Sequence, residues 1–229
     1  MNQDTKITRA RAKTPRAAAI AGILFSVLLI TSLVLIKISV PVSPLDVGEW
    51  LSGDSKAVGL ALNLVPFAGV AFLWFIGVVR DRLAEHEDRL FATVFLGSGL
   101  LFLATLFTSA AIAGGIISLY GATPGILVDA AIYTYGRLVS YEIMNVYALK
   151  MAGVFMLSTC SLSLRTGIFP RWMAYLGIVL ALLLMLSLGL LSAAWSPLLF
   201  PLWILLISVY ILWENFRRQE GEQITAASS

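Results

Sequence analysis

The chain has 229 residues, of which 59% are hydrophobic and 13% are charged, and its formal net charge is +3. Soluble domains average about 45–50% apolar and about 25% charged residues. This composition therefore excludes a soluble enzyme, a disordered chain and a disulfide-rich secreted scaffold. The apolar residues come in blocks long enough to cross a bilayer, so we predict an all-α fold, a polytopic bundle of transmembrane helices.

Six apolar blocks alternate with polar segments along the chain. A helix needs about 20 residues to cross the hydrocarbon core, and each block is near that length or longer. The first block is too long for a signal peptide, so we expect an uncleaved span. The short links after spans two and four predict that spans two and three pair and that spans four and five pair. The predicted spans are Ala17–Ile38, Ala57–Val79, Phe91–Tyr120, Ile143–Leu164, Trp172–Ser192 and Pro197–Trp213.

The six spans form one predicted transmembrane domain over residues 17–213. A basic N-terminus occupies residues 1–16, and a polar tail that we expect to be disordered after Arg218 occupies residues 214–229. Cytoplasmic loops carry an excess of Lys and Arg. With the N-terminus inside, 12 of the 16 Lys and Arg residues fall on the inner side, so both termini are predicted to be cytoplasmic.

These basic residues lie where topology places them, and they give no nucleic-acid signal. We expect the N-terminus and the Arg80–Arg82 turn to contact anionic lipid at the cytoplasmic face. On the outer face, the segment before span four predicts a short interfacial helix. Thr123 can cap such a helix, Pro124 suits its first position and Gly136 suits its end.

The sequence offers few residues for catalysis or metal binding. One cysteine, Cys160, excludes an intramolecular disulfide and a Cys-based metal site, and one histidine, His86, excludes a bis-His haem or a Ser-His-Asp triad. The acidic residues around His86 are interpreted as a solvated turn rather than a metal site. We therefore expect no metal and no cofactor, and the sequence leans against an enzyme.

Span four is the least apolar span and carries the candidate site. At about 100° per residue, Glu142, Asn145 and Lys150 share one broad face. Candidate partners are Asp129, in the preceding helix, and Asn63, in span two. Because a charge inside a span is costly, such a cluster could bind an anionic headgroup, a small solute or a proton. Alternatively, Lys150 snorkels to the interface and the asparagines make interhelical hydrogen bonds.

Small residues in span three offer a second possible contact surface. Ala110 and Gly114 form a small-xxx-small pair, a pattern that lets helices approach closely. The pair can serve a homodimer, a membrane-protein partner or packing inside one bundle. Packing inside the bundle is the interpretation that we favour, because every helix of a bundle needs such a face.

Two stretches resemble segments of uncharacterised bacterial multi-pass inner-membrane proteins, of the domain-of-unknown-function type. They are FLWFIGVVRDRLAEHEDRLFATVFLGSGLLF, Phe72–Phe102, and SLRTGIFPRWMAYLGIVLALLL, Ser163–Leu184. Each places a basic turn between apolar spans. The resemblance implies location in the bacterial cytoplasmic (inner) membrane. It implies no substrate and no catalytic residue.

Three functional hypotheses follow from the sequence. The first is a non-enzymatic accessory subunit or a bundle that binds lipid or a small ligand. The second is a transporter or channel that uses the polar cluster of span four, which requires Lys150 to face a water-filled cavity. The third is a lipid-modifying enzyme, which the sequence supports least because catalysis needs a general acid–base pair or a metal.

Overall fold

The computed structural model describes residues 3–40, 55–83, 89–122, 130–167, 169–186 and 195–227. Side chains are described for residues 16–40, 55–80, 92–119, 131–167, 169–186 and 195–217. Thr123, Pro124, Asp129 and the loop around His86 lie outside the described residues, so the predictions made for them stay predictions.

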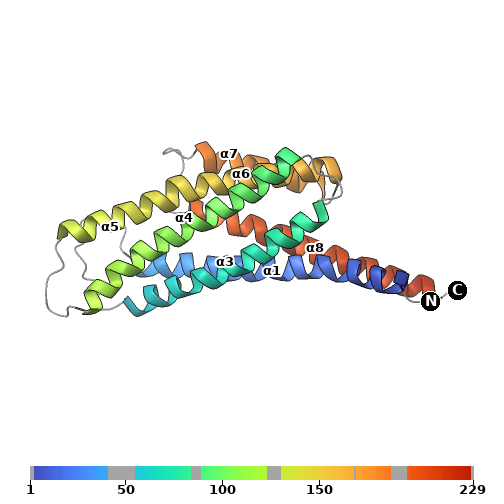
Figure 1. Ribbon diagram of the computed structural model, residues 1–229, viewed down its shortest axis with the longest axis horizontal. Helices are drawn as coiled ribbons and strands as arrows, with labels where there is room; N and C mark the ends of the chain where they lie inside the picture. The colour runs from blue at the N-terminus through green and yellow to red at the C-terminus, as the bar shows by residue number, and fades with distance from the viewer. Residues whose placement is uncertain are drawn as a thin grey trace.

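Helices account for nearly all of these residues, and no strand occurs within the described ranges. The predicted all-α fold is therefore confirmed (Figure 1). The elements are α1 (Gln3–Ser39), α3 (Ser55–Leu83), α4 (Arg89–Ala122), α5 (Ala130–Glu142), the π-helix η1 (Ile143–Ala148), α6 (Leu149–Thr166), α7 (Arg171–Leu186) and α8 (Ser196–Ala227).

Five helical segments are long and apolar enough to cross a membrane. The helix α7 is apolar but shorter over its 16 described residues. The end of the predicted fifth span, up to Ser192, lies beyond the described part of α7. The five segments are Arg16–Ser39, Ser55–Arg80, Ala92–Leu119, Ala131–Thr166 and Ser196–Arg217.

The helices pack in two groups, α1 with α3 and α8, and α6 with α4 and α7. The two groups meet along α4, α6 and α8. The helix α3 also packs against α4, so the two pairs predicted from the short links are confirmed. Figure 1 shows α1 and α8 projecting together beyond the other helices, with both termini at that end of the bundle.

The predicted end of a helix at Gly136 is wrong. Gly136 lies inside α5, and α5, η1 and α6 run without a break from Ala130 to Thr166. The glycine serves packing instead, because a β-carbon at this position would lie 3.0 Å from the Ile116 side chain of α4. A residue without a side chain thus lets α5 lie close to α4.

The tail is also more ordered than expected, since α8 continues past Arg218 to Ala227. The polar composition of this stretch suggested disorder. However, nucleation is the costly step in forming a helix, and adding residues to an existing helix avoids it. The transmembrane part of α8 supplies that existing helix.

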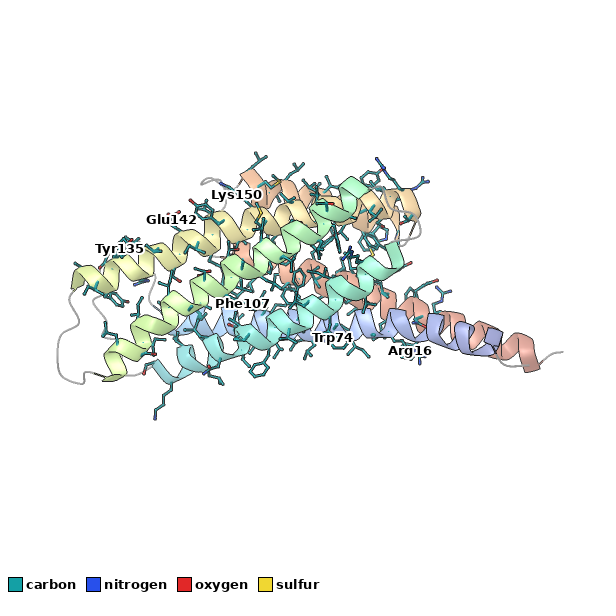
Figure 2. The ribbon with its side chains drawn as sticks, viewed as in Figure 1. Arg16, Trp74, Phe107, Tyr135, Glu142 and Lys150 are labelled. Carbon is teal, nitrogen blue, oxygen red and sulfur yellow. The ribbon has the colours of Figure 1, made fainter. Side chains whose placement is uncertain are left out.

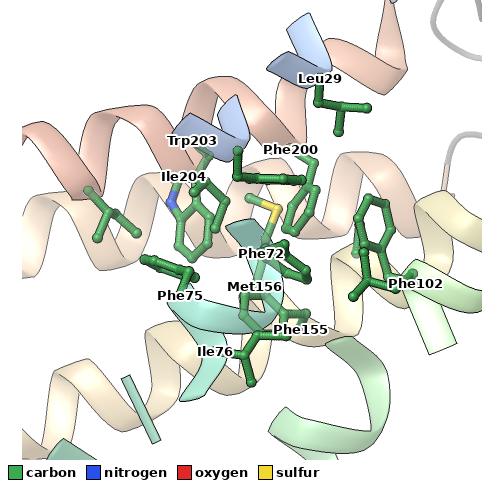
Figure 3. Packing of buried hydrophobic residues seen from close by; sticks show 14 of the residues in the cluster. Leu29, Phe72, Phe75, Ile76, Phe102, Phe155, Met156, Phe200, Trp203 and Ile204 are labelled. Carbon is green, nitrogen blue, oxygen red and sulfur yellow. The ribbon is translucent and has the colours of Figure 1, made fainter. Parts of the chain in front are cut away.

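Phenylalanine rings fill the centre of the bundle (Figure 3). Seven rings from five helices lie in mutual contact, and each is at most 1% exposed. The Phe72 ring is central, with centroids 4.6 to 6.2 Å from five others. Edge-on and tilted pairs at such distances add to the energy of burial. The seven residues are Phe25, Phe72, Phe75, Phe95, Phe102, Phe155 and Phe200.

Glycine permits the closest helix contacts around this cluster. A β-carbon at Gly22 of α1 would collide with Ser208 of α8 and with Phe75. A β-carbon at Gly177 of α7 would collide with Cys160 and with Trp203. In a bilayer, helices associate chiefly through such close packing.

Cation–π contacts hold α1 and α8 together at both ends of their contact. At one end the Lys37 ammonium lies 4.3 Å from the centroid of the Trp195 ring. At the other end the Arg16 guanidinium lies 5.2 Å from the centroid of the Phe216 ring. Each such contact contributes about 0.5–1 kcal/mol at an exposed position.

The position of Phe72 leads to a stability prediction. Phe72→Ala leaves a cavity among five rings and is expected to lower the free energy of unfolding by about 3–5 kcal/mol. Unfolding in mixed micelles, followed by circular dichroism, measures this loss. Phe67→Ala, on the same helix but with a side chain 66% exposed, is the matched control. Similar losses in the two variants would contradict the role of the cluster.

Candidate functional site

The candidate residues of span four flank or occupy the π-helix η1. Glu142 is the last residue of α5, Asn145 lies within η1, and Lys150 is the second residue of α6. In η1 the backbone N–H of Leu149 donates to the carbonyl of Met144, five residues back instead of four. Short π-helical segments are rare and are frequent at functional sites.

A π-turn contains one residue more than an α-turn, and this alters the face predicted from a regular helix. One extra residue corresponds to about 100° of rotation. The prediction that Glu142, Asn145 and Lys150 share a face assumed a regular α-helix throughout. The side chains must therefore be placed from their environments in the structure.

Asn145 forms a hydrogen bond within its own helix. Its Nδ2 donates to the backbone carbonyl of Tyr141 at 2.9 Å. Its Oδ1 is buried and accepts no hydrogen bond within the described structure. A buried acceptor without a donor costs about 1–3 kcal/mol. The amide nitrogen of Asn145 is thus hydrogen-bonded within its own helix, and the amide oxygen is buried in the protein.

Glu142 and Lys150 have surroundings different from that of Asn145. The Glu142 side chain is exposed and the Lys150 side chain is half-buried. No described residue forms an ion pair with either of them. Two exposed rings lie on the same stretch of helix, Tyr141 (48% exposed) and Tyr147 (60% exposed). Figure 2 shows Tyr135, Glu142 and Lys150 in succession along α5, η1 and α6.

Asn63 does not join this group. Its side chain is exposed on α3, and the helices packed against α3 are α1 and α4. Arg137 of α5 is half-buried, and its Nη1 donates to the Tyr133 hydroxyl at 3.4 Å. The described structure therefore places Glu142 and Lys150 on the surface of one helix, with Asn63 on another.

Sequence reasoning missed a pair of serines beside η1. The Ser109 hydroxyl donates to the Ser140 carbonyl at 2.8 Å, and the Ser140 hydroxyl donates to the Ser109 carbonyl at 2.9 Å. The pair joins α4 to α5 close to the point where the π-helix begins. The sequence gives no signal for it, because the two serines are 31 residues apart and meet only through tertiary packing.

The structure places the small residues of span three on two sides of α4. Ala110 packs against the buried core, and a β-carbon at Gly114 would lie 3.9 Å from Leu62 of α3. Ala111 and Gly115, one position on, are exposed, and Gly115 has no neighbour within 4 Å of its β-carbon position. Packing inside the bundle thus engages the Ala110 and Gly114 face. Association through that face stays a prediction.

Comparison with known proteins adds no relative. No protein-family model, curated protein or solved structure matches the chain. Among the residues with described positions, no group of three or more His, Cys, Asp and Glu side chains is placed to hold a metal ion.

The serine pair leads to a second prediction. Ser109→Ala and Ser140→Ala each remove a hydroxyl that donates to the backbone carbonyl of the other serine. Each variant is expected to lower the free energy of unfolding by about 0.6 kcal/mol and by no more than about 1.7 kcal/mol, the average and the maximum for hydrogen bonds between membrane helices. Unfolding in mixed micelles measures it. Thr108→Ala serves as the control, because Thr108 donates only within its own helix, to Ala104. Unchanged stability in both serine variants would show that the pair does not stabilise the contact between α4 and α5.

Proposed function

We propose that this chain is a non-enzymatic membrane protein that binds a phospholipid or a similar amphiphile on the surface formed by α5, η1 and α6. The observation that carries the proposal is the position of its charges. Glu142 and Lys150 lie at the surface of the bundle without described ion-pair partners, whereas the centre is filled with phenylalanine. A ligand that binds Glu142 and Lys150 therefore approaches from the lipid around the bundle.

The depths of the two charges agree with a headgroup ligand. Arg165, exposed in the last turn of α6, marks the opposite membrane edge. At about 1.5 Å per residue, Lys150 lies about 22 Å from Arg165 along the helix, and Glu142 lies about 34 Å from it. The hydrocarbon core is about 30 Å thick. The Lys150 backbone then lies about 8 Å inside the far edge of the core, a distance that its side chain can largely span, and Glu142 lies among the headgroups.

The arrangement of the termini supports six spans with both ends on the same side of the membrane, the side that the excess of basic residues predicts to be cytoplasmic. Both termini lie at one end of the bundle (Figure 1), which requires an even number of crossings. Five segments qualify by length, and α7, packed between α6 and α8, supplies the sixth. The bacterial inner membrane is proposed from the resemblance of two segments to proteins found there.

The cytoplasmic end suits contact with anionic lipid. Exposed arginines occur at this end of α3, α6, α7 and α8, together with exposed Trp74, Trp172 and Trp213. Indole rings favour the headgroup layer, and each basic residue near an anionic surface contributes about 1 kcal/mol. The exposed arginines at this end are Arg80, Arg165, Arg171 and Arg217.

Transport through the bundle centre has less support than lipid binding. A transporter needs polar groups or water along the substrate path, and charged pathway residues face the bundle interior. In the region whose side chains are described, phenylalanines occupy the junction of α1, α3, α4, α6 and α8. Lys150 lies away from that junction, on the α6 surface, and Asn145 is engaged by its own helix.

Removing the ammonium group tests the proposed function. Lys150→Met is expected to lose co-purified phospholipid, because a half-buried cation at the core edge interacts with phosphate. Native mass spectrometry of protein extracted gently from its own membrane measures the bound mass. Lys56→Met removes an exposed cation from α3, outside the proposed binding surface, and should retain lipid. Equal lipid retention by wild type and Lys150→Met would refute the site.

Labelling of cysteines tests the proposed topology. The only native thiol, Cys160, is buried, so single cysteines can be added without a large background. A cysteine in place of Ser228 is expected to react with a membrane-impermeant maleimide only after lysis of spheroplasts. A cysteine in place of Tyr135, 71% exposed, is expected to react in intact spheroplasts. The opposite pattern would invert the orientation.

A further inference from the structure

We infer that the headgroup bound at α5, η1 and α6 is zwitterionic, with a phosphate at Lys150 and a primary ammonium at Glu142. Phosphatidylethanolamine has this chemistry. The inference rests on the proposed function and adds the headgroup class to it. The juxtaposition that carries it is a half-buried cation and an exposed carboxylate on one helix, in a fixed order of depth.

The order of the two charges matches the order of charges in such a lipid. Lys150 lies towards the middle of the bundle, and Glu142 lies eight residues nearer the outer end of the helix. In a zwitterionic phospholipid the phosphate is attached next to the acyl chains, and the amine extends outward. The lipid thus presents its negative group at the depth of the cation and its positive group at the depth of the carboxylate.

The spacing suits a bridge rather than a direct salt bridge. Eight residues correspond to about 12 Å along a helix, and the two side chains make no ion pair with each other. The four-carbon stem of Lys150 lets its ammonium rise towards the headgroup layer. The gap that remains between the two charged groups is one that a phosphate and amine joined by two carbons can fill.

Other headgroups satisfy only part of this arrangement. A glycerol headgroup offers a phosphate to Lys150 but no positive charge to Glu142, which then faces an anionic lipid with its own negative charge. A trimethylated amine carries a positive charge but no N–H to donate, whereas a primary ammonium donates three hydrogen bonds to acceptors such as the carboxylate. The exposed hydroxyls of Tyr141 and Tyr147 add further polar groups beside Glu142.

The test compares three lipids on the intact protein. Delipidated protein in detergent is titrated with phosphatidylethanolamine, phosphatidylglycerol or phosphatidylcholine of identical acyl chains, and native mass spectrometry gives the bound fractions. An exposed ion pair is worth up to about 1 kcal/mol, so we expect about a fivefold preference for phosphatidylethanolamine over the other two. Glu142→Gln should abolish the preference while leaving phosphatidylglycerol binding equal to or stronger than in the wild type.

A control variant and the alternative outcomes separate the two proposals. Glu214→Gln neutralises a carboxylate at the opposite end of the bundle and should keep the preference. If wild type binds all three lipids equally, or if Glu142→Gln keeps the preference, the zwitterionic headgroup is refuted while lipid binding stands. If wild type binds none of the lipids, the proposed function itself is refuted. Because Glu142 is exposed, its substitution leaves the packed core unchanged.

Discussion

The contact among the phenylalanine rings determines how the helices of this bundle can be arranged. Lipid tails are as apolar as leucine side chains. Membrane helices therefore associate through close packing rather than through exclusion of apolar surface from water. Rings from α1, α3, α4, α6 and α8 meet around Phe72, and each must fit the others. Glycines such as Gly22 and Gly177 then bring the backbones close enough for those rings to touch. A centre packed in this way leaves the charges of Glu142 and Lys150 at the bundle surface.

The apolar blocks made the helices and the pairing of neighbours predictable, because segment length and loop length act locally. The continuity from α5 to α6 was not predictable in this way. Gly136 has the sequence character of a helix end, yet Ile116 of α4 makes it a packing residue. The helices α4 and α5 thus lie close together where Gly136 faces Ile116. The sequence alone allowed Gly136 to end a helix or to pack inside one, and the contact with α4 decides for packing.

The candidate site was predictable in its residues but not in its geometry. Lys150 and Glu142 stand out in an apolar chain because a charge in a span is costly. Their positions on the helix, however, depend on η1, and a π-turn leaves no composition or periodicity by which a sequence reveals it. Asn145 shows the same limit. Its Nδ2 donates to the carbonyl of Tyr141 in its own helix, a contact that a regular face of span four does not predict, and its part in ligand binding stays a prediction.

The pairing of α1 with α8 brings together two helices that are far apart in the sequence. The contacts of Arg16 with Phe216 and of Lys37 with Trp195 join residues about 200 and about 160 positions apart. Contacts between distant parts of a chain form late, because the whole intervening loop must be closed first. During synthesis, one side of α1 therefore stays without its partner in the bilayer until α8 has been translated. A chain terminated before α8 leaves α1 without one of its two main partners.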